Sequence, residues 1–422
     1  MKNQKKRSEE ISIVSLFSGC GGLDLGFEGG FPVLKSCLNP RIHASWFKNQ
    51  TSNSSWVTLP KTRFKTIFSN DILPAAKSSW VPYFSKRNKE TVFRAESIVD
   101  LVKRHQAGEK VFPKADIVIG GFPCQDFSVA GKRRGFNSHK AHNGSFLQNG
   151  DEATEENRGM LYIWMRRVID IVRPKMFIAE NVKGLISLAD AKRIIERDFS
   201  AVGGEGYLVI DAKVLSAANY GVPQRRERVF FIGFRKDLLT KKALKALSSK
   251  VISPEFDPYP RPTHGEATNN CVLPYMTVGK ALQDLLEPEK SSDLSQKAFS
   301  KAKWYGRHCQ GQVEVDLNGL GPTIRAEHHG NIEFRRLSKT NGGKYLNELK
   351  SGDRERRLTV RECARIQTFP DDYEFIREHK NYKLTSSEGY KVIGNAVPPI
   401  LGYHLATRLQ ELWPIIFKKG NK

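Results

Sequence analysis

The sequence predicts an α/β fold in which a mostly parallel sheet is followed by a second, smaller and irregular domain. Over residues 1–235, short β-branched runs alternate with helical stretches, which is the rhythm of a parallel sheet. That rhythm stops near Lys236, and the following stretch is rich in Pro, Gly, Lys and Asn. An amphipathic stretch over residues 400–413 closes the chain. We therefore expect a first domain over residues 1–235, a second over 236–389, and a segment over 390–422 that returns to the first.

The first strand is expected over residues 11–17, which are mostly apolar and β-branched. It opens into a Gly-rich turn over residues 18–22, followed by an amphipathic helix. This order is typical of nucleotide-like cofactor sites, because small residues allow close approach and a helix N-terminus faces the ligand. Asp24 stands where the third glycine of GxGxxG would be, which disfavours a dinucleotide. A purely structural turn is the alternative.

A second strand is expected over residues 64–68, after a polar segment over residues 32–63 that has the composition of an insertion or long loop. This strand leads to Asp71. An acid at the end of a second strand can accept hydrogen bonds from a ribose diol. The alternative is a helix N-cap, because a helical stretch begins near Ala75.

A buried strand over residues 117–119 leaves through two glycines toward Pro123 and Cys124. Open α/β sheets bind ligands at the carboxyl ends of their strands, so a thiol on this stiff turn is well placed for chemistry. Its thiolate would be a strong nucleophile. The alternative is a structural cysteine, because free cysteines are among the most buried residues. The polar segment over residues 131–159 is then a lid over the site or a surface loop.

Two further strands carry charged residues toward the same edge. The strand over residues 176–179 delivers Glu180, whose alternative role is that of a capping residue. A short connection precedes the strand over residues 229–233. If that connection forms a hairpin, the last strand runs antiparallel, and Arg228 at its beginning lies on the edge that carries Glu180. Arg226 and Arg228 alternate, so at least one is expected to point inward; a solvated, phosphate-binding patch is the alternative.

The composition indicates a polyanionic partner. The chain has 68 Lys and Arg against 45 Asp and Glu, a formal net charge of +23 and a pI near 9.7. Nucleic acid is the first expectation and an anionic membrane surface the second. Six cysteines without a CxxC pair argue against a disulfide framework and structural zinc.

No metal is expected either, because His308, Cys309, His328 and His329 lack a recognised ligand spacing. The charged start of the chain lacks the apolar core of a signal peptide, and no apolar run approaches membrane-spanning length. We therefore expect a soluble, intracellular protein with no membrane association.

Six motifs, in order, resemble those of the DNA (cytosine-5) methyltransferases, most closely the compact bacterial restriction–modification type. The motifs are Phe17-Ser18-Gly19-Cys20-Gly21-Gly22, Gly121-Phe122-Pro123-Cys124-Gln125, Glu180-Asn181-Val182, Gln224-Arg225-Arg226-Glu227-Arg228, Arg361-Glu362-Cys363-Ala364-Arg365 and Gly394-Asn395-Ala396-Val397-Pro398-Pro399. One such motif is a coincidence, whereas six in order are highly specific. The resemblance implies a Rossmann-like sheet of the S-adenosylmethionine-dependent methyltransferase type, S-adenosylmethionine as cofactor, and a target-recognition domain over residues 236–389.

The resemblance also implies which residues bind the cofactor. They belong to the first turn and to segments near other strand ends: Phe17, Ser18, Gly19, Cys20, Gly21, Gly22, Ile72, Pro123, Asn395 and Val397. Asp71 would bind the ribose, and Glu96 would lie near the adenine, where the family more usually has Asp. Asp71 lies 49 residues after Gly22, well beyond the usual ~20 for an acid on a ribose. Glu28 is therefore a competing candidate.

For catalysis, the resemblance implies Cys124, Glu180, Arg228 and Arg226. Cys124 would add to carbon 6 of a cytosine flipped out of the duplex, which makes carbon 5 nucleophilic toward the methyl group. Glu180 would donate to N3, and Arg228 would hold O2. Contacts to DNA are expected from Gln125, Ser128, Thr323, Ile324 and Arg325.

The implied partners are double-stranded DNA and a cognate restriction endonuclease as a functional pair, with the enzyme acting as a monomer in the bacterial cytoplasm, at the nucleoid. Two other functions stay open. A branch of this family methylates tRNA, but it carries a Cys-Phe-Thr tripeptide, and no cysteine here is followed by Phe-Thr. A non-enzymatic nucleic-acid binder on a decayed scaffold would first lose Cys124, Glu180 or Arg228, and all three are present.

Overall fold

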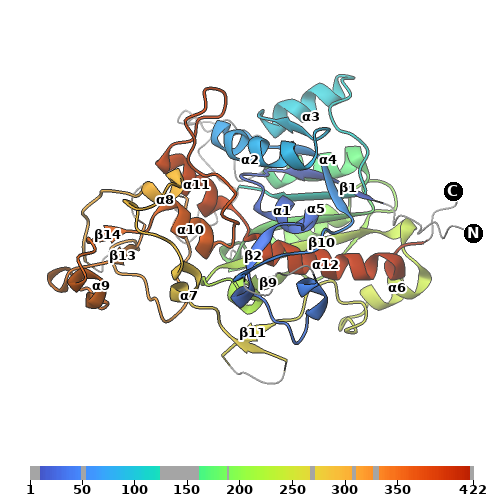
Figure 1. Ribbon diagram of the computed structural model, residues 1–422. Helices are drawn as coiled ribbons and strands as arrows, with labels where there is room; N and C mark the ends of the chain where they lie inside the picture. Colours follow the sequence, from blue (N-terminus) through green and yellow to red (C-terminus); the bar gives the residue numbers. More distant parts are fainter. Residues whose placement is uncertain are drawn as a thin grey trace, which may run out of the picture.

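The computed structural model describes residues 10–48, 54–123, 161–187, 190–266, 271–306, 310–326 and 332–418. Within these ranges an eight-stranded sheet forms the centre of the molecule, in the order β5-β4-β1-β6-β7-β10-β8, with β9 paired to β10 (Figure 1). The strands are β1 (Ile11–Leu16), β4 (Phe64–Asn70), β5 (Val92–Arg94), β6 (Ile117–Gly121), β7 (Met176–Val182), β8 (Tyr207–Val209), β9 (Lys213–Ser216) and β10 (Glu227–Arg235).

The strands β5, β4, β1, β6 and β7 are parallel to one another, whereas β10 is antiparallel to β7, β8 and β9. The predicted mostly parallel sheet is therefore confirmed. The predicted antiparallel direction of the strand over residues 229–233 is confirmed as well. This reversal brings the beginning of β10 to the edge where β7 ends, since Arg228 pairs in register with Val182.

Each strand alternates its side chains between two hydrophobic cores, one on each face of the sheet. In β1, Ile11 and Ile13 enter one core, whereas Val14 and Leu16 enter the other. The same alternation holds in β6, β7 and β10. Because both faces are covered, the strands read as nearly continuous apolar runs, as expected for a buried parallel sheet.

Helices cover both faces. The first core includes α1 (Gly22–Glu28), α2 (Pro74–Arg87) and α12 (Pro399–Ile416), and the second includes α3 (Ile98–Gln106), α4 (Leu161–Val172) and α5 (Ala191–Ser200). The first and last of these helices, α1 and α12, pack against each other along the sheet. Among the described residues, no helix combines the length and the apolar character needed to cross a membrane.

The segment over residues 32–63, which we expected as an insertion or long loop, contains short regular elements. The strands β2 (Pro32–Leu34) and β3 (Trp56–Thr58) pair antiparallel, with the 3-10 turns η1 (Lys35–Cys37) and η2 (Ala44–Phe47) between them. Trp46 packs against Tyr403 and His404 of α12, with ring centroids 4.8 and 4.9 Å apart. The segment therefore packs on the last helix.

From residue 236 onward, before α12, the described elements are short, as the composition predicted. They are α6 (Lys241–Leu247), β11 (His264–Gly265), β12 (Leu273–Pro274), α7 (Val278–Leu282), α8 (Leu294–Lys297), β13 (Phe334–Arg336), α9 (Leu346–Lys350), β14 (Arg356–Arg357), α10 (Val360–Ile366) and α11 (Ser386–Asn395). In Figure 1, α9, β13 and β14 lie at the opposite end of the molecule from α6. The first of these helices, α6, packs on α12.

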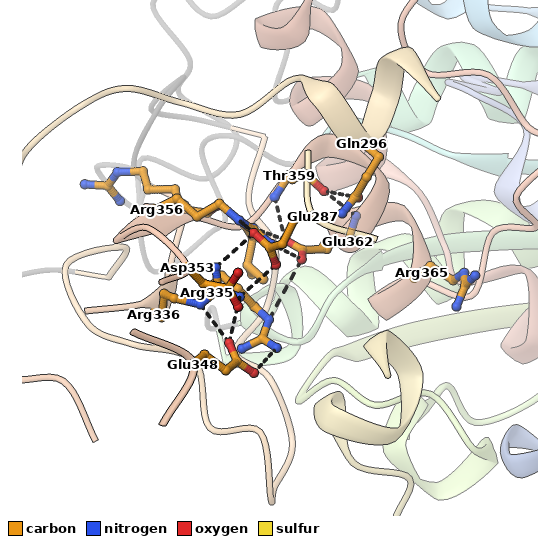
Figure 2. A network of polar contacts seen from close by, with 12 residues as sticks. Glu287, Gln296, Arg335, Arg336, Glu348, Asp353, Arg356, Thr359, Glu362 and Arg365 are labelled. Atoms are coloured by element: carbon orange, nitrogen blue, oxygen red, sulfur yellow. Dashed lines mark hydrogen bonds and ion pairs between the residues drawn. The ribbon is translucent and has the colours of Figure 1, made fainter. Parts of the chain in front are cut away.

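Buried arginines hold the β13–β14 part together (Figure 2). The carboxylate of Glu287 accepts hydrogen bonds from Arg336 at 2.8 and 2.9 Å and from Arg356 at 3.0 Å. Arg356 also forms a two-pronged pair with Glu362, which caps the N-terminus of α10. Planar guanidinium groups suit such paired contacts with carboxylates. An ionic network therefore joins this two-stranded sheet to α10.

Glu287→Gln is predicted to lower the free energy of unfolding by about 3 kcal/mol, because it leaves two buried arginines short of a negative charge. Burial opposes ionisation of Glu287, but Arg336 and Arg356 outweigh it and lower its pKa from 4.5 to about 2. The contribution of Glu287 is therefore complete above pH 4.5 and is lost as the pH falls toward 2. Chemical denaturation of the wild type and of Glu287→Gln between pH 3 and 7 measures this difference in the free energy of unfolding.

The matched control is Glu255→Gln. Glu255 pairs with Lys242 at 2.9 Å, but both side chains are more than half exposed. Such a surface pair is worth at most about 1 kcal/mol. Equal losses of stability in Glu287→Gln and Glu255→Gln would contradict a stabilising role for the buried network.

Candidate active site

A cavity of about 600 Å³ opens at the carboxyl edge of the parallel strands. Its walls come from the ends of β1, β4, β6 and β7, where open α/β sheets bind ligands. Two segments that are distant in sequence close it, residues 323–326 and 394–397. The site is therefore built from both ends of the chain and from the irregular region between them.

The turn after β1 forms the first wall. Phe17 and Gly19 have positive φ angles, 52° and 54°, so the chain reverses direction sharply after the strand. The N–H of Gly19 donates to Asp71 at 2.9 Å, and the N–H of Leu73 donates to the other carboxylate oxygen at 2.8 Å. Burial raises the pKa of Asp71, while these backbone donors act in the opposite direction. Asp71 thus fixes two turns and also lines the cavity.

The second wall depends on a close backbone approach at Gly22. A Cβ atom at this position would lie 2.2 Å from the carbonyl oxygen of Val397. Only glycine allows the start of α1 to pack so tightly against residues 394–397. Cys20 takes no part in the lining: its thiol is buried and donates to the carbonyl of Val392 at 3.3 Å. Gly21 likewise faces away from the cavity, toward Trp80.

Two acidic residues predicted near the cofactor point elsewhere. Glu96 is not among the cavity-lining residues, and its carboxylate pairs with Arg104 and, at 3.8 Å, with Arg94. Its neighbours Ser97 and Ile98 line the cavity instead. Glu28 pairs with Arg87 at 3.2 Å, outside the cavity. Of the two acids considered for a ribose, Asp71 is the one that faces the cavity.

A buried ion pair stands at the ends of β7 and β10. Arg228 Nε lies 2.9 Å from Glu180 Oε1, and both side chains are only about 10% exposed. Burial raises the pKa of Glu180, while Arg228 and Arg226 lower it. A Cβ atom on Gly121 would lie 2.5 Å from Glu180 Oε2. The absence of a side chain at Gly121 therefore leaves room for the Glu180 carboxylate.

Arg226 has a different environment from Arg228. It is fully buried and lies outside the cavity lining. Its guanidinium donates to the carbonyl of Ile324 at 3.0 Å and to the carbonyl of Gly394 at 2.8 Å. The two arginines predicted to act in catalysis therefore differ in position. Arg228 faces the cavity, whereas Arg226 joins the two wall segments that are distant in sequence.

Several predicted residues lie outside the described ranges. They are Cys124, Gln125 and Ser128, together with the predicted lid over residues 131–159 and the residues His308, Cys309, His328 and His329. The chain is described up to Pro123, which lines the cavity, and Asn181 Nδ2 donates to the carbonyl of Phe122 at 3.1 Å. Within the described parts, no group of three or more His, Cys, Asp or Glu side chains could hold a metal ion.

The remaining predicted residues line the cavity: Ser18, Ile72, Thr323, Ile324, Arg325, Asn395 and Val397. Among the lining residues that sequence reasoning did not assign are the polar side chains of Asp24, Asn181, Gln310 and Lys391. Asp24 and Asn181 could have been found, because each lies within or beside a motif at a strand end. Gln310 and Lys391 carried no such signal.

Comparisons with known proteins agree with this architecture. Residues 11–411 match the family described as C-5 cytosine-specific DNA methylase. Type II methyltransferase M.BsuRI of Bacillus subtilis is 30% identical over 428 residues, covering 98% of this chain and 82% of the relative. Type II methyltransferase M.BspRI of Lysinibacillus sphaericus is 31% identical and covers 96% and 82%. The methyltransferase EhMeth of Entamoeba histolytica shares the fold, with a TM-score of 0.55 at 13% identity, covering 97% and 99%.

Asp24 predicts an unusual pH dependence. Burial raises its pKa from 3.8 to about 6, against hydrogen bonds from Ser15 at 2.6 Å and Trp80 at 2.7 Å. Because the pKa of Asp24 is higher in the folded than in the unfolded protein, its protonation stabilises the fold. This contribution is complete below the unfolded-state pKa and is lost as the pH rises through about 6. Asp24→Asn should remove the effect, so the stability difference between variant and wild type should change by about 3 kcal/mol between pH 4 and 7.

The measurement is urea unfolding of both proteins across that pH range. Wild type and Asp24→Asn are expected to converge or cross, because only the wild type loses this contribution as the pH rises. Parallel stability curves would contradict a protonated Asp24 in the folded protein.

Proposed function

The chain belongs to the C-5 cytosine-specific DNA methylase family, and we propose that its cavity binds S-adenosylmethionine on one side and a flipped-out cytosine on the other. The protein is thus a DNA (cytosine-5) methyltransferase. The observation that carries the proposal for the cytosine side is the buried Glu180–Arg228 pair. It stands at the carboxyl edge of the sheet, beside the glycine that leads through Pro123 to Cys124.

The residues at the β1 and β4 ends fit an adenosyl cofactor. The positive-φ turn at Phe17 and Gly19 leaves room next to β1, and the Asp71 carboxylate faces the same space from the second strand. Asn395 and Val397 close the pocket from the far end of the chain. S-adenosylmethionine supplies an electrophilic methyl group on a sulfonium. The chain's residues hold it at the sheet edge and exclude water.

On the cytosine side, each residue has one task. The Cys124 thiolate forms a bond to carbon 6, which moves electron density to carbon 5 and makes it nucleophilic. Glu180, whose pKa is raised by burial, donates to N3 when it is protonated, and Arg228 holds O2, so the charge that develops on the ring is stabilised. After methyl transfer, the carbon 5 proton leaves to a base, and the thiolate is eliminated. Because these ring atoms are covered in a stacked duplex, the base must be flipped out.

The two arginines then have separate roles in the proposal. Arg228 contacts the base, whereas Arg226 acts through the backbone of the cavity walls. Glu96 does not line the cavity, whereas its neighbours Ser97 and Ile98 do. Asp71, rather than Glu28, is proposed to bind the ribose.

For DNA, we propose that residues 1–235 form the catalytic and cofactor-binding domain and residues 236–389 the target-recognition domain, with 390–422 returning to the first. Contacts are assigned to Gln125, Ser128, Thr323, Ile324 and Arg325. The net charge of +23 supports a double-stranded DNA substrate. Two relatives named as Type II methyltransferases support a restriction–modification role with a cognate endonuclease. We propose a monomer that acts on nucleoid DNA in the cytoplasm.

The test is bisulfite sequencing of plasmid DNA from cells that express the protein. Protected cytosines are expected in one short recurring sequence. They should be absent with Cys124→Ser, whose hydroxyl is a far weaker nucleophile than a thiolate, while DNA binding in a gel-shift assay stays within about threefold of wild type.

Two outcomes would overturn the proposal. Protection that persists in the Cys124→Ser variant would contradict the nucleophile. If the folded wild type protects no plasmid cytosine, bisulfite sequencing of cellular tRNA distinguishes the tRNA branch from a binding-only protein.

A further inference from the structure

We propose that Gln367 is a positioning residue which, through Gln224, couples the wall on the cofactor side of the cavity to the loop on its DNA side. The inference rests on the proposed function of the cavity. Gln367 ends α10 and does not line the cavity, so it is not a catalytic residue. Its side chain nevertheless contacts both segments that close the site, one directly and one through Gln224.

The two glutamines form a continuous hydrogen-bonded chain. Gln367 Nε2 donates to the carbonyls of Ile393 at 3.0 Å and Ala396 at 2.9 Å. Gln224 Nε2 donates to Gln367 Oε1 at 2.7 Å, and Gln224 Oε1 accepts from the N–H of Ile324 at 3.3 Å. Both glutamine side chains are fully buried. Backbone groups about 70 residues apart in sequence are thus joined by two side chains.

The donor and acceptor roles of the two glutamine side chains are fixed. An amide group has two N–H donors and one acceptor oxygen, and both donors of Gln367 are taken by carbonyls. Its oxygen must therefore accept from Gln224, which leaves the oxygen of Gln224 for Ile324. A buried polar group that loses its partner costs about 1–3 kcal/mol. A shift of either wall alone would unpair a buried group, so the two walls are expected to move together.

The backbone groups at the two ends of this series of hydrogen bonds lie on opposite sides of the cavity. Ala396 lines it between Asn395 and Val397, which are proposed to hold the cofactor. Ile324 lines it beside Thr323, which is proposed to face DNA. Arg226 spans the same two segments through the carbonyls of Ile324 and Gly394. Two independent buried side chains therefore bridge the same pair of walls.

The helix α10, which leads to Gln367, is itself anchored at its other end. The N-terminus of α10 is anchored by Glu362 in the arginine network (Figure 2), and α10 runs from there to Gln367. Because α10 is a rigid element that joins this network to Gln367, we expect a displacement of the β13–β14 part to be carried to Gln367. DNA bound to the proposed recognition region would thus favour one position of the cofactor wall.

The experiment measures binding of S-adenosylhomocysteine by calorimetry, with and without a saturating duplex that carries the sequence found by bisulfite sequencing. In wild type, the duplex is expected to raise cofactor affinity about tenfold. Gln367→Met keeps a similar volume but no amide, and the ratio should fall to about threefold, because Arg226 still bridges the two walls. Gln224→Met removes the hydrogen bonds to Gln367 and Ile324 but leaves Gln367 bonded to the carbonyls of Ile393 and Ala396. It should therefore lower the ratio as Gln367→Met does, while its affinity for S-adenosylhomocysteine alone stays near that of wild type.

The matched control is Asn39→Leu. Asn39 is equally buried and its amide donates to two carbonyls, those of Thr263 at 3.0 Å and Cys271 at 2.9 Å, but it is hydrogen-bonded to neither cavity wall. It should lose stability like Gln367→Met and keep the wild-type ratio. The inference is overturned if wild type shows no coupling, if Gln367→Met and Gln224→Met keep the wild-type ratio, or if Asn39→Leu also lowers it. Failure of wild type to bind S-adenosylhomocysteine at all would instead contradict the proposed function.

Discussion

The fold depends on a backbone-to-backbone contact between its first and last helices. A Cβ atom on Gly26 would lie 2.5 Å from the carbonyl oxygen of Pro399 and 2.7 Å from the Cα of Gly402. Together with Gly22, this contact allows α12 and the segment before it to lie directly on α1. The cavity exists because of this approach, since residues 394–397 would otherwise stand too far from the turn after β1 to close it.

The two parts of the molecule are stabilised by different means. Around the sheet, side chains of β1, β6, β7 and β10 enter apolar cores on both faces. In the β13–β14 part, where apolar runs are short, Arg336 and Arg356 are buried against shared carboxylates. Buried ion pairs gain less net energy than apolar contacts of similar size, but they require a defined geometry. Such geometry suits a region that must hold irregular loops in place.

The sequence predicted the sheet, its reversed strand and the cavity residues at the strand ends, because these follow from local periodicity and from the rule that ligands bind at the carboxyl ends of strands. The cavity residues Thr323, Ile324, Asn395 and Val397 were implied only by the family resemblance. The sequence placed Asp71 and Glu180 correctly at strand ends. It could not place Glu96, because whether a side chain two residues before a helix faces a cavity or the nearby Arg104 depends on the backbone direction at that point. It could not identify Gln367 either, because its hydrogen-bond partners are backbone carbonyls distant in sequence, which leave no periodic signal.

Arg226 and Arg228, at the start of β10, have different roles. They are separated by a single residue, and Arg228 lies in the strand at the cavity while Arg226 precedes it. Arg228 pairs with a carboxylate, so its charge is available at the reacting edge. Arg226 donates to two carbonyls and carries its charge into the interior, where burial lowers its pKa. A buried guanidinium is a costly way to join two carbonyls. Its position between Ile324 and Gly394 is therefore best explained by the need to keep both cavity walls in register with the Glu180–Arg228 pair.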